Sequence, residues 1–570
     1  MRFLGVLTVL YALVLPAVAL DREAFTFTDY QLTVRVEPEQ QRLGVRGTVT
    51  LRNDSTSPQK DIALQISSTL DWSSIKLKGK PVEFVGHEYT SDIDHTGALS
   101  EAIVTLPNDL PPKGTVVLEV GYEGVVPLDT TRLTQIGVPE DKAKHADWDQ
   151  ISKSFTAVRG IGYVAWYPVA VEEASLSEGD SVPEAVARWK SRHADTTMHL
   201  LFESTSRTPM PVSFSSSPNL AAGNSKSDIA KVADFRVTRM GISVPTFVIA
   251  DYQKLTQDLV TVHYLAGQEE AAKNYAETAA QIDPVIPRGP SSTSLHIFGL
   301  ADPDASSFVT EGMLLTPLKS SMTNEAELSM VYAEALQRVV SSRAWVRDGL
   351  AHYAQAAFIE AQHGRQEALD YLNSHRAALV EGEKPKPSAV SGDAGGNWET
   401  VHSLINAPDD LYLQTKAMAV WWMLRDMLEN PSLGVLPEYH ADEDKDAAYV
   451  EHLIEKNNPR DLGWFFEDWV YHDRGLPDFR VDSVFSSQIP SGGFLVTITI
   501  ANLGGAGAET PVTLQFEGGE IRRRLEVRAK SKATLRVEAA GKPSEVTVND
   551  GSVPESDMTN NTYKIENPTH

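Results

Sequence analysis

The sequence contains no cysteine in 570 residues. This excludes disulfide bonds, cysteine-ligated zinc and thiol catalysis, so packing and hydrogen bonds have to stabilise the fold. Basic residues are also scarce, because 51 Lys and Arg stand against 77 Asp and Glu and the net charge is −26. A chain of that charge is repelled by nucleic acid and by anionic membrane surfaces. We therefore expect neither as a partner.

Long apolar runs are missing after the first twenty residues. Those residues, MRFLGVLTVLYALVLPAVAL, combine Arg2 with an apolar stretch, the helix breaker Pro16 and the small residues Ala17 and Ala19, which is the pattern of a signal peptide. We expect residues 1–19 to be cleaved off, leaving an extracytoplasmic (periplasmic or secreted) chain without a membrane span. The alternative is an uncleaved anchor, because an apolar run of about 17 to 20 residues can just cross a bilayer.

Residues 20–252 have the pattern of β-structure. Apolar and polar residues alternate in FTFTDYQLTVRVEPE, GVRGTVTLRNDS and GTVVLEVGYEG, and Pro, Gly or Asn-Asp interrupts the alternation. A second strand-rich block runs from Thr196 to about Tyr252. Alternation of period two is typical of strands with one buried face. We predict an N-terminal β-rich domain over this range.

Residues 253–476 form a second unit, in which short strands give way to helices. From Asn324 to Asp473 the apolar residues recur with helical spacing. Asn324 with Glu327 three residues later is a helix-start signature, and Gly364 is a natural C-terminal cap. This predicts a mixed domain that is helical in its second half.

Short strands return after Pro477 at regular spacing, for example in GFLVTITIANLGG and TPVTLQFEGG. Such spacing favours a β-sandwich over residues 477–570. The expected fold class is therefore multidomain α+β, with sheets at both ends of the chain and a mixed domain between them.

Two stretches in the helical part resemble known motifs. Residues 345–353, WVRDGLAHY, are similar to W-x-N-E-G-F-A-x-Y, and residues 414–417, QTKA, are similar to Y-E-K-G-A. Both motifs, and the order of the three predicted domains, are those of the membrane alanyl aminopeptidase family of gluzincin zinc metallopeptidases. The resemblance implies a gluzincin-like (thermolysin-like) middle domain and an Ig-like C-terminal β-sandwich.

The zinc ligands of that family are replaced here. The family motif H-E-x-x-H places two histidines on one helix face to bind zinc, and its glutamate activates water. Aligning Glu334 on that glutamate puts Ala333 and Gln337 at the histidine positions, Asp348 at the third ligand and Gln414 at the oxyanion tyrosine. Alanine cannot ligate a metal, and a neutral amide is a poor zinc ligand. We expect no cofactor.

Three polar residues remain as candidates for catalysis: Glu334, Asp348 and His352. Glu334 could act as a general base, although without a metal a solvated or salt-bridged carboxylate is the more common role. Asp348 and His352 are four residues apart, share a helix face and could form a carboxylate–histidine pair.

The hypothesis that follows is an exported homologue of the zinc aminopeptidases that is not catalytic and binds a peptide or protein in the former catalytic cleft. Two alternatives stay open. One is an active metallopeptidase whose rearranged zinc site uses Glu334, Asp348 and His352. The other is a structural or adhesive protein that binds its partner through residues 477–570.

Overall fold

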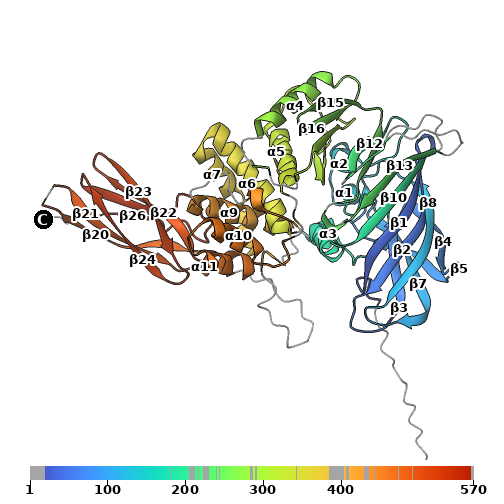
Figure 1. The fold of residues 1–570 in the computed structure, drawn as a ribbon, viewed down its shortest axis with the longest axis horizontal. Coiled ribbons are helices and arrows are strands. Elements are labelled where there is room, and N and C mark those ends of the chain that lie inside the picture. The colour runs from blue at the N-terminus through green and yellow to red at the C-terminus, as the bar shows by residue number, and fades with distance from the viewer. Residues whose placement is uncertain are drawn as a thin grey trace, which may run out of the picture.

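The structure is a computed structural model that describes residues 20–179, 181–204, 212–215, 217–221, 230–238, 240–242, 244–282, 287–288, 292–339, 341, 343–383, 403–405, 410–428, 436–441, 443–472, 474–490 and 492–565. The expected signal peptide, residues 1–19, lies outside this range. The chain is multidomain and elongated, with sheets at both ends and helices between them (Figure 1). No helix in the described part is long and apolar enough to cross a membrane.

The N-terminal region is built around a seven-stranded sheet. Its strand order is β13-β10-β1-β2-β8-β4-β5, in which β1 pairs antiparallel with β2 and parallel with β10. Along β8 exposed and buried residues alternate, as the sequence pattern predicts. The strands are β1 (Phe25–Glu37), β2 (Arg42–Asn53), β4 (Leu70–Leu77), β5 (Lys80–Pro81), β8 (Thr115–Val125), β10 (Thr197–Ser204) and β13 (Ala230–Val237).

Two smaller sheets and three helices complete this region. The sheets have the orders β3-β7-β6 and β12-β11-β14-β9. Their strands are β3 (Gln59–Ser67), β6 (Phe84–Thr90), β7 (Ala98–Leu110), β9 (Phe155–Val158), β11 (Val212–Phe214), β12 (Ser217–Ala221) and β14 (Phe247–Ala250), and the helices are α1 (Thr131–Gln135), α2 (Glu140–Ala146) and α3 (Ser181–Arg192).

The middle region begins with a five-stranded sheet of order β15-β16-β17-β19-β18. β18 stands at the end of this order and pairs only with β19, so it is an edge strand. The elements are β15 (Gln253–Gln257), β16 (Val260–Tyr264), α4 (Glu269–Ile282), β17 (Leu295–Gly299), β18 (Phe308–Thr310) and β19 (Met313–Thr316).

Helices follow, as the apolar spacing predicts. α5 begins at Asn324, but its capping residue is Thr323, whose side chain accepts from the Ala326 N–H. Gly364 is the C-cap of α6, with a φ of 92°. The helices are α5 (Asn324–Arg338), α6 (Ala344–His363), α7 (Arg365–Ser374), α8 (Arg376–Gly382), α9 (Asp410–Leu428), α10 (Tyr449–Asn457) and α11 (Gly463–Phe466).

The tryptophan and glycine of the WVRDGLAHY stretch hold α6 against α9. Trp345 stacks on Trp421 with ring centroids 5.3 Å apart, and the Trp421 indole N–H donates to the Trp345 carbonyl. A Cβ on Gly349 would lie 2.6 Å from the Ala417 Cβ. Glycine is therefore needed at this position for the two helices to approach so closely.

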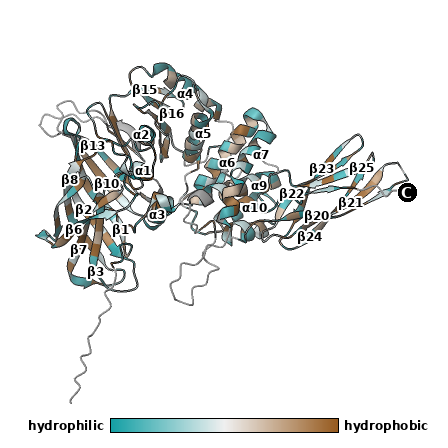
Figure 2. Ribbon diagram, turned by 180° about the vertical axis from the view of Figure 1, so that it is seen from behind, coloured by the Kyte–Doolittle hydropathy of each residue, from teal (hydrophilic) through white to brown (hydrophobic). Residues whose placement is uncertain are grey.

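The C-terminal region consists of a three-stranded and a four-stranded sheet, with orders β20-β21-β24 and β23-β22-β25-β26. Hydrophobic and hydrophilic residues both occur along these strands (Figure 2). The buried hydrophobic residues of the two sheets belong to one core. The strands are β20 (Phe479–Gln488), β21 (Phe494–Asn502), β22 (Ala508–Phe516), β23 (Gly519–Val527), β24 (Lys532–Ala539), β25 (Pro543–Val548) and β26 (Thr562–Lys564).

Buried apolar residues fall into two large cores and one small one. One large core belongs to the N-terminal region alone, and the other runs without interruption from the middle helices into the C-terminal sheets. The small core joins Trp148 and Phe155 of the N-terminal region to Phe298 and Leu315 of the middle sheet. The N-terminal region therefore meets the rest of the described chain across a small apolar contact, beside which the candidate site lies.

Candidate functional site

A cleft of about 480 Å³ lies where the N-terminal and middle regions meet. One wall comes from α3 and from residues 159–163, a second from β18 and its flanking residues, and a third from α5 and α6. The motif-bearing helices therefore border a cavity that is large enough for a small ligand. Of the three catalytic candidates, only Asp348 lines it.

Glu334 is buried in α5 and held by two arginines. Its Oε1 accepts from Nη2 of Arg338 and from Nη2 of Arg288, at 3.0 Å each. The side chains of Glu334 and Arg338 are both only 1% exposed. A buried carboxylate of this kind depends on its cationic partners, because an unpaired charge is costly in the interior. Glu334 is thus an ion-paired carboxylate that contributes no surface to the cleft.

Gln337 is tied to the backbone and to a neighbouring threonine. Its amide N–H donates to the Ala333 carbonyl across 3.2 Å, and its Oε1 accepts from Thr293 Oγ1 across 2.9 Å. The Thr293 N–H in turn donates to the Gln337 carbonyl. The side-chain oxygen and the backbone carbonyl of Gln337 therefore link α5 to the segment before β17, while its amide nitrogen bonds within the helix.

Asp348 lies at the start of α6 between an arginine and a tyrosine. Its Oδ2 accepts from Nη2 of Arg347 across 2.7 Å, and its Oδ1 accepts from the Tyr332 hydroxyl across 3.1 Å. Burial raises the pKa of Asp348, but the charge and hydrogen bond of Arg347 outweigh burial and lower it overall. Asp348 is therefore an anion at neutral pH.

His352 lies one turn further along α6, behind the cleft wall. Its Nδ1 is 2.9 Å from Oε1 of Gln355, and its ring centroid is 4.6 Å from that of Tyr332. Burial lowers the pKa of His352 to about 4, so the ring is neutral at pH 7. Asp348 and His352 share Tyr332 as a common neighbour, and no hydrogen bond joins the two side chains in the described structure.

The residues that align with the zinc-binding motif do not suit a zinc ion. Ala333 offers no ligand atom, and the oxygen of Gln337 is taken by Thr293. Two guanidinium groups at 3.0 Å from Glu334 also place positive charge where a dication would have to bind. Glu334 with Asp348 and His352 does not form a group whose ligand atoms lie close enough to share an ion, within the part of the chain described.

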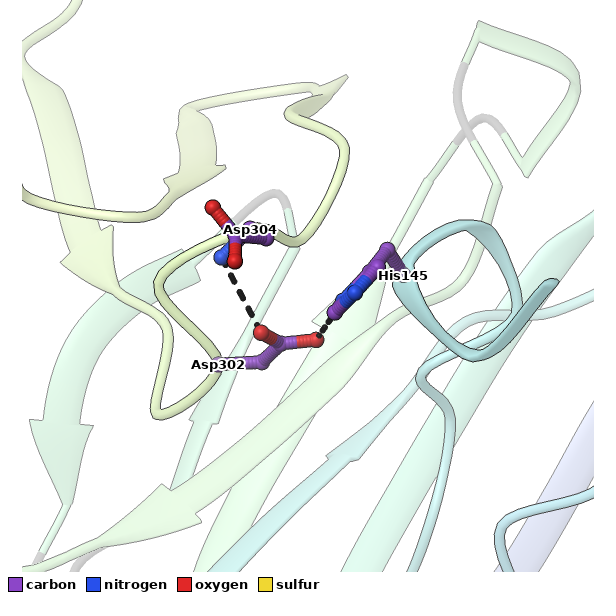
Figure 3. A group of neighbouring side chains, drawn as sticks. All are labelled: His145, Asp302 and Asp304. Carbon is purple, nitrogen blue, oxygen red and sulfur yellow. Dashed lines mark hydrogen bonds and ion pairs between the residues drawn. The ribbon is translucent and has the colours of Figure 1, made fainter. Parts of the chain in front are cut away.

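A separate group of ligand-type side chains, His145, Asp302 and Asp304, lies between α2 and the loop after β17 (Figure 3). Nδ1 of His145, in the last turn of α2, is 2.6 Å from Oδ2 of Asp302, and Asp304 follows in the loop after β17. The ligand atoms of the three residues lie within 4.8 Å of one another. Lys319 already neutralises part of this charge, since its Nζ is 3.6 Å from Asp304. Sequence reasoning did not find this group, because His145 lies 157 residues before Asp302.

The cleft also contains cations that sequence reasoning did not single out. Arg132 forms two hydrogen bonds with Asp147, at 2.8 and 2.7 Å, and is buried. Arg159 is paired with Asp149 in the same way and packs over Trp148. These are closed ion pairs in the cleft floor.

The cleft lining includes further charged residues. Lys190 of α3 and Arg347 of α6 line it, as does Glu311 in the turn between β18 and β19. Gln414, which aligns with the motif tyrosine, is half-buried in α9 and is not among the residues that line the cleft.

Comparisons with known proteins give a distant likeness. No protein-family model and no curated protein matches the chain. Among solved structures it is similar to the M1 zinc metallopeptidase from Deinococcus radiodurans, with 14% identity, 79% of this chain and 94% of that chain covered, and a TM-score of 0.43. A point mutant of the same enzyme bound to a Tyr-Ser-Ala substrate is similar with the same identity and coverage and a TM-score of 0.45. A sequence identity and a TM-score this low assign no activity to this chain.

Proposed function

We propose that this chain is an exported homologue of the zinc aminopeptidases that does not hydrolyse peptides and instead binds them in the cleft between α3, β18 and α6. The ion pairs of Glu334 with Arg338 and Arg288 support this most directly. The motif glutamate of the resembled family has to accept a proton from a metal-bound water. Here the carboxylate is buried, neutralised by two guanidinium groups and outside the cleft lining.

The cleft itself favours a peptide over other ligands. Its volume of about 480 Å³ suits a short peptide segment, and its walls combine apolar side chains such as Leu336 and Val309 with polar ones such as Thr293. The edge strand β18 lies along it, and an edge strand can pair with an extended peptide through main-chain hydrogen bonds.

Two measurements on the chain starting at Leu20 test this proposal. We expect no hydrolysis of aminoacyl-anilide substrates, with or without added zinc. We expect short peptides to bind, and Val309→Trp to weaken binding because the indole fills the cleft. Leu259→Trp, in an exposed turn of the same sheet, is the matched control and should bind normally.

Hydrolysis that a chelator abolishes, and that Glu334→Gln also abolishes, would overturn the proposal. It would favour the alternative, an active metallopeptidase with a rearranged site. One observation speaks for that alternative: Nε2 of His352 is buried and has no hydrogen-bond partner. In that case His352→Ala should remove activity to the same extent as the chelator.

A further inference from the structure

Two buried histidines lie on the face of the middle sheet that meets the N-terminal region. His263 in β16 and His296 in β17 are 2% and 4% exposed, and Nε2 of His263 is 2.9 Å from Nδ1 of His296. His263 is in register with Phe298, which lies two residues after His296, so the three side chains share one face of the sheet. Phe298 belongs to the small core between the two regions, which we call the joint. The histidine pair therefore lies next to the joint.

The pair is suited to the neutral state. In neutral imidazoles one ring nitrogen donates and the other accepts, so Nε2 of His263 and Nδ1 of His296 can share one hydrogen bond. Nδ1 of His263 is also buried, without a hydrogen-bond partner in the described structure. Burial, together with the charges of His296 and Lys254, lowers the pKa of His263 to about 3, and burial lowers that of His296 to about 4. A proton on the pair is therefore costly while the joint is closed.

The groups around the pair disfavour a charge on it. Lys254 stands opposite His263 on β15, and its positive charge repels a second cation. The Tyr252 ring lies 6.3 Å from that of His263, and burial raises the pKa of its hydroxyl, so it is neutral. Ser294 Oγ is 3.4 Å from Nε2 of His296. The strands β9 and β14 of the N-terminal region, which close the joint, contribute apolar side chains to it.

We propose that the His263–His296 pair is a pH-sensitive switch: when it takes up a proton, the N-terminal and middle regions separate at the joint and the cleft opens. Separation is the least costly way to bring water to the pair. The joint contains ten buried residues, whereas the opposite face of the same sheet packs into the large core that continues into the C-terminal sheets. The cleft walls come from both regions, so separation moves them apart. This inference does not depend on what the cleft binds.

The pH range of the switch follows from the ordinary pKa of histidine. Once water reaches the two rings, their pKa values return to about 6.5, so below that pH the open form binds protons that the closed form does not. At pH 5 each histidine then increases the equilibrium constant for opening by roughly thirtyfold. The ion pair of His145 with Asp302 also links the two regions, but a proton on His145 strengthens it, so this pair opposes opening.

The absence of cysteine allows a test by thiol labelling of the full chain. Ala157→Cys places a thiol in the joint, and Ala250→Cys gives a second site there. Ala272→Cys, in α4 and the large core, is the matched control, and all three alanines are fully buried. The labelling rate, divided by that of an unfolded peptide at the same pH, measures how often the site opens. From pH 7.5 to pH 5 we expect this rate to rise in the joint by roughly thirtyfold for each histidine, and to stay constant for Ala272→Cys.

Histidine variants of the Ala157→Cys chain identify the group responsible. His263→Gln should remove a factor of roughly thirty from the rise, whereas His199→Gln, at a half-exposed histidine, and His145→Gln should keep it. A labelling rate in the joint that does not change with pH would overturn the inference. An equal rise for Ala272→Cys would also overturn it, since the whole sheet would then be unfolding. A rise that His145→Gln removes and His263→Gln keeps would overturn it by assigning the response to the other pair.

Discussion

Arg338 lies one helical turn after Glu334, and its guanidinium donates to the Glu334 carboxylate across 3.0 Å, with both side chains almost fully buried. The spacing of four residues puts the two side chains on one face of α5. Arg288 joins them from outside the helix. The carboxylate that the sequence aligns with a water-activating base is thus part of a buried ion-pair cluster.

The first prediction concerns the stability that this cluster provides. Glu334→Gln should lower the free energy of unfolding by roughly 3 to 5 kcal/mol, because it leaves the Arg338 charge buried without its anion. Denaturant unfolding measures this. The double variant Glu334→Gln/Arg338→Met should recover part of the loss, since it removes both charges. Glu184→Gln, in an exposed pair with Arg188, is the control and should change stability little. If Glu334→Gln lowers the free energy of unfolding as little as Glu184→Gln does, Glu334 does not form a stabilising buried ion pair with Arg338.

The second prediction concerns metal content. After dialysis against zinc, Glu334→Gln should leave the zinc content of the chain unchanged, because the residues around it do not suit an ion. Any zinc that does remain should depend on the group of His145, Asp302 and Asp304, so His145→Ala should lower it, while His363→Ala, at an exposed histidine, should not. Elemental analysis of the dialysed chain and its variants measures their zinc content. Stoichiometric zinc that Glu334→Gln removes would contradict both the geometry and the proposed function.

The third prediction is a pH dependence of stability. His263 and His296 are buried, with Nε2 of one 2.9 Å from Nδ1 of the other. Burial, and for His263 also the charge of its partner, lowers their pKa values to about 3 and about 4. The unfolded chain then binds more protons than the folded chain below about pH 6.5, so stability is full above that pH and falls as pH decreases towards 4.

The expected loss by pH 4 is on the order of 3 kcal/mol for each histidine, since about 2.5 units separate the ordinary pKa from that pH and each unit corresponds to about 1.4 kcal/mol. The free energy of unfolding measured between pH 7 and pH 4 tests this. His263→Gln keeps a polar group beside His296 but does not titrate, so its profile should be flatter. His199→Gln, at a half-exposed histidine, should leave the profile as it is. A profile that His263→Gln does not change would show that another group is responsible.

The fourth prediction concerns the contact between α6 and α9. Gly349→Ala should destabilise the chain by about 1 to 3 kcal/mol, because the new Cβ would lie 2.6 Å from that of Ala417 and the helices would have to move apart. The rescue variant Gly349→Ala/Ala417→Gly removes the opposing atom and should restore most of the stability. If the double variant is no more stable than the single one, the close approach is not the cause.

The sequence predicted much of this fold because its signals are local. Period-two alternation identified strands such as β8, and the helix over α5 was placed within one residue of its cap. The difference of Ala333 and Gln337 from the histidines of the zinc-binding motif can also be seen in the sequence, since it needs only an alignment to a short motif. The sequence also contains a signal for the ion pair of Glu334, because Arg338 follows it at a spacing of four residues, which places both side chains on one helix face.

The features that could not be predicted from the sequence depend on contacts between segments that are far apart in the chain. Arg288 reaches Glu334 from 46 residues away, and His145 meets Asp302 from 157 residues away. The spacing of Asp348 and His352 allows a direct pair, whereas the placement of Tyr332 beside both is set by how α5 packs on α6. Lys190 faces the cleft only because α3 is brought against the helical part of the chain.

The cleft walls are contributed by α3, β18 and α6, which belong to separate stretches of the sequence. No fragment that stops at a domain boundary contains the whole cavity. Expression of the N-terminal region alone, or of the helical part alone, would leave out part of the cleft lining and expose its apolar residues to water. Ligand screens and crystallisation trials should therefore begin with the undivided chain from Leu20 to His570.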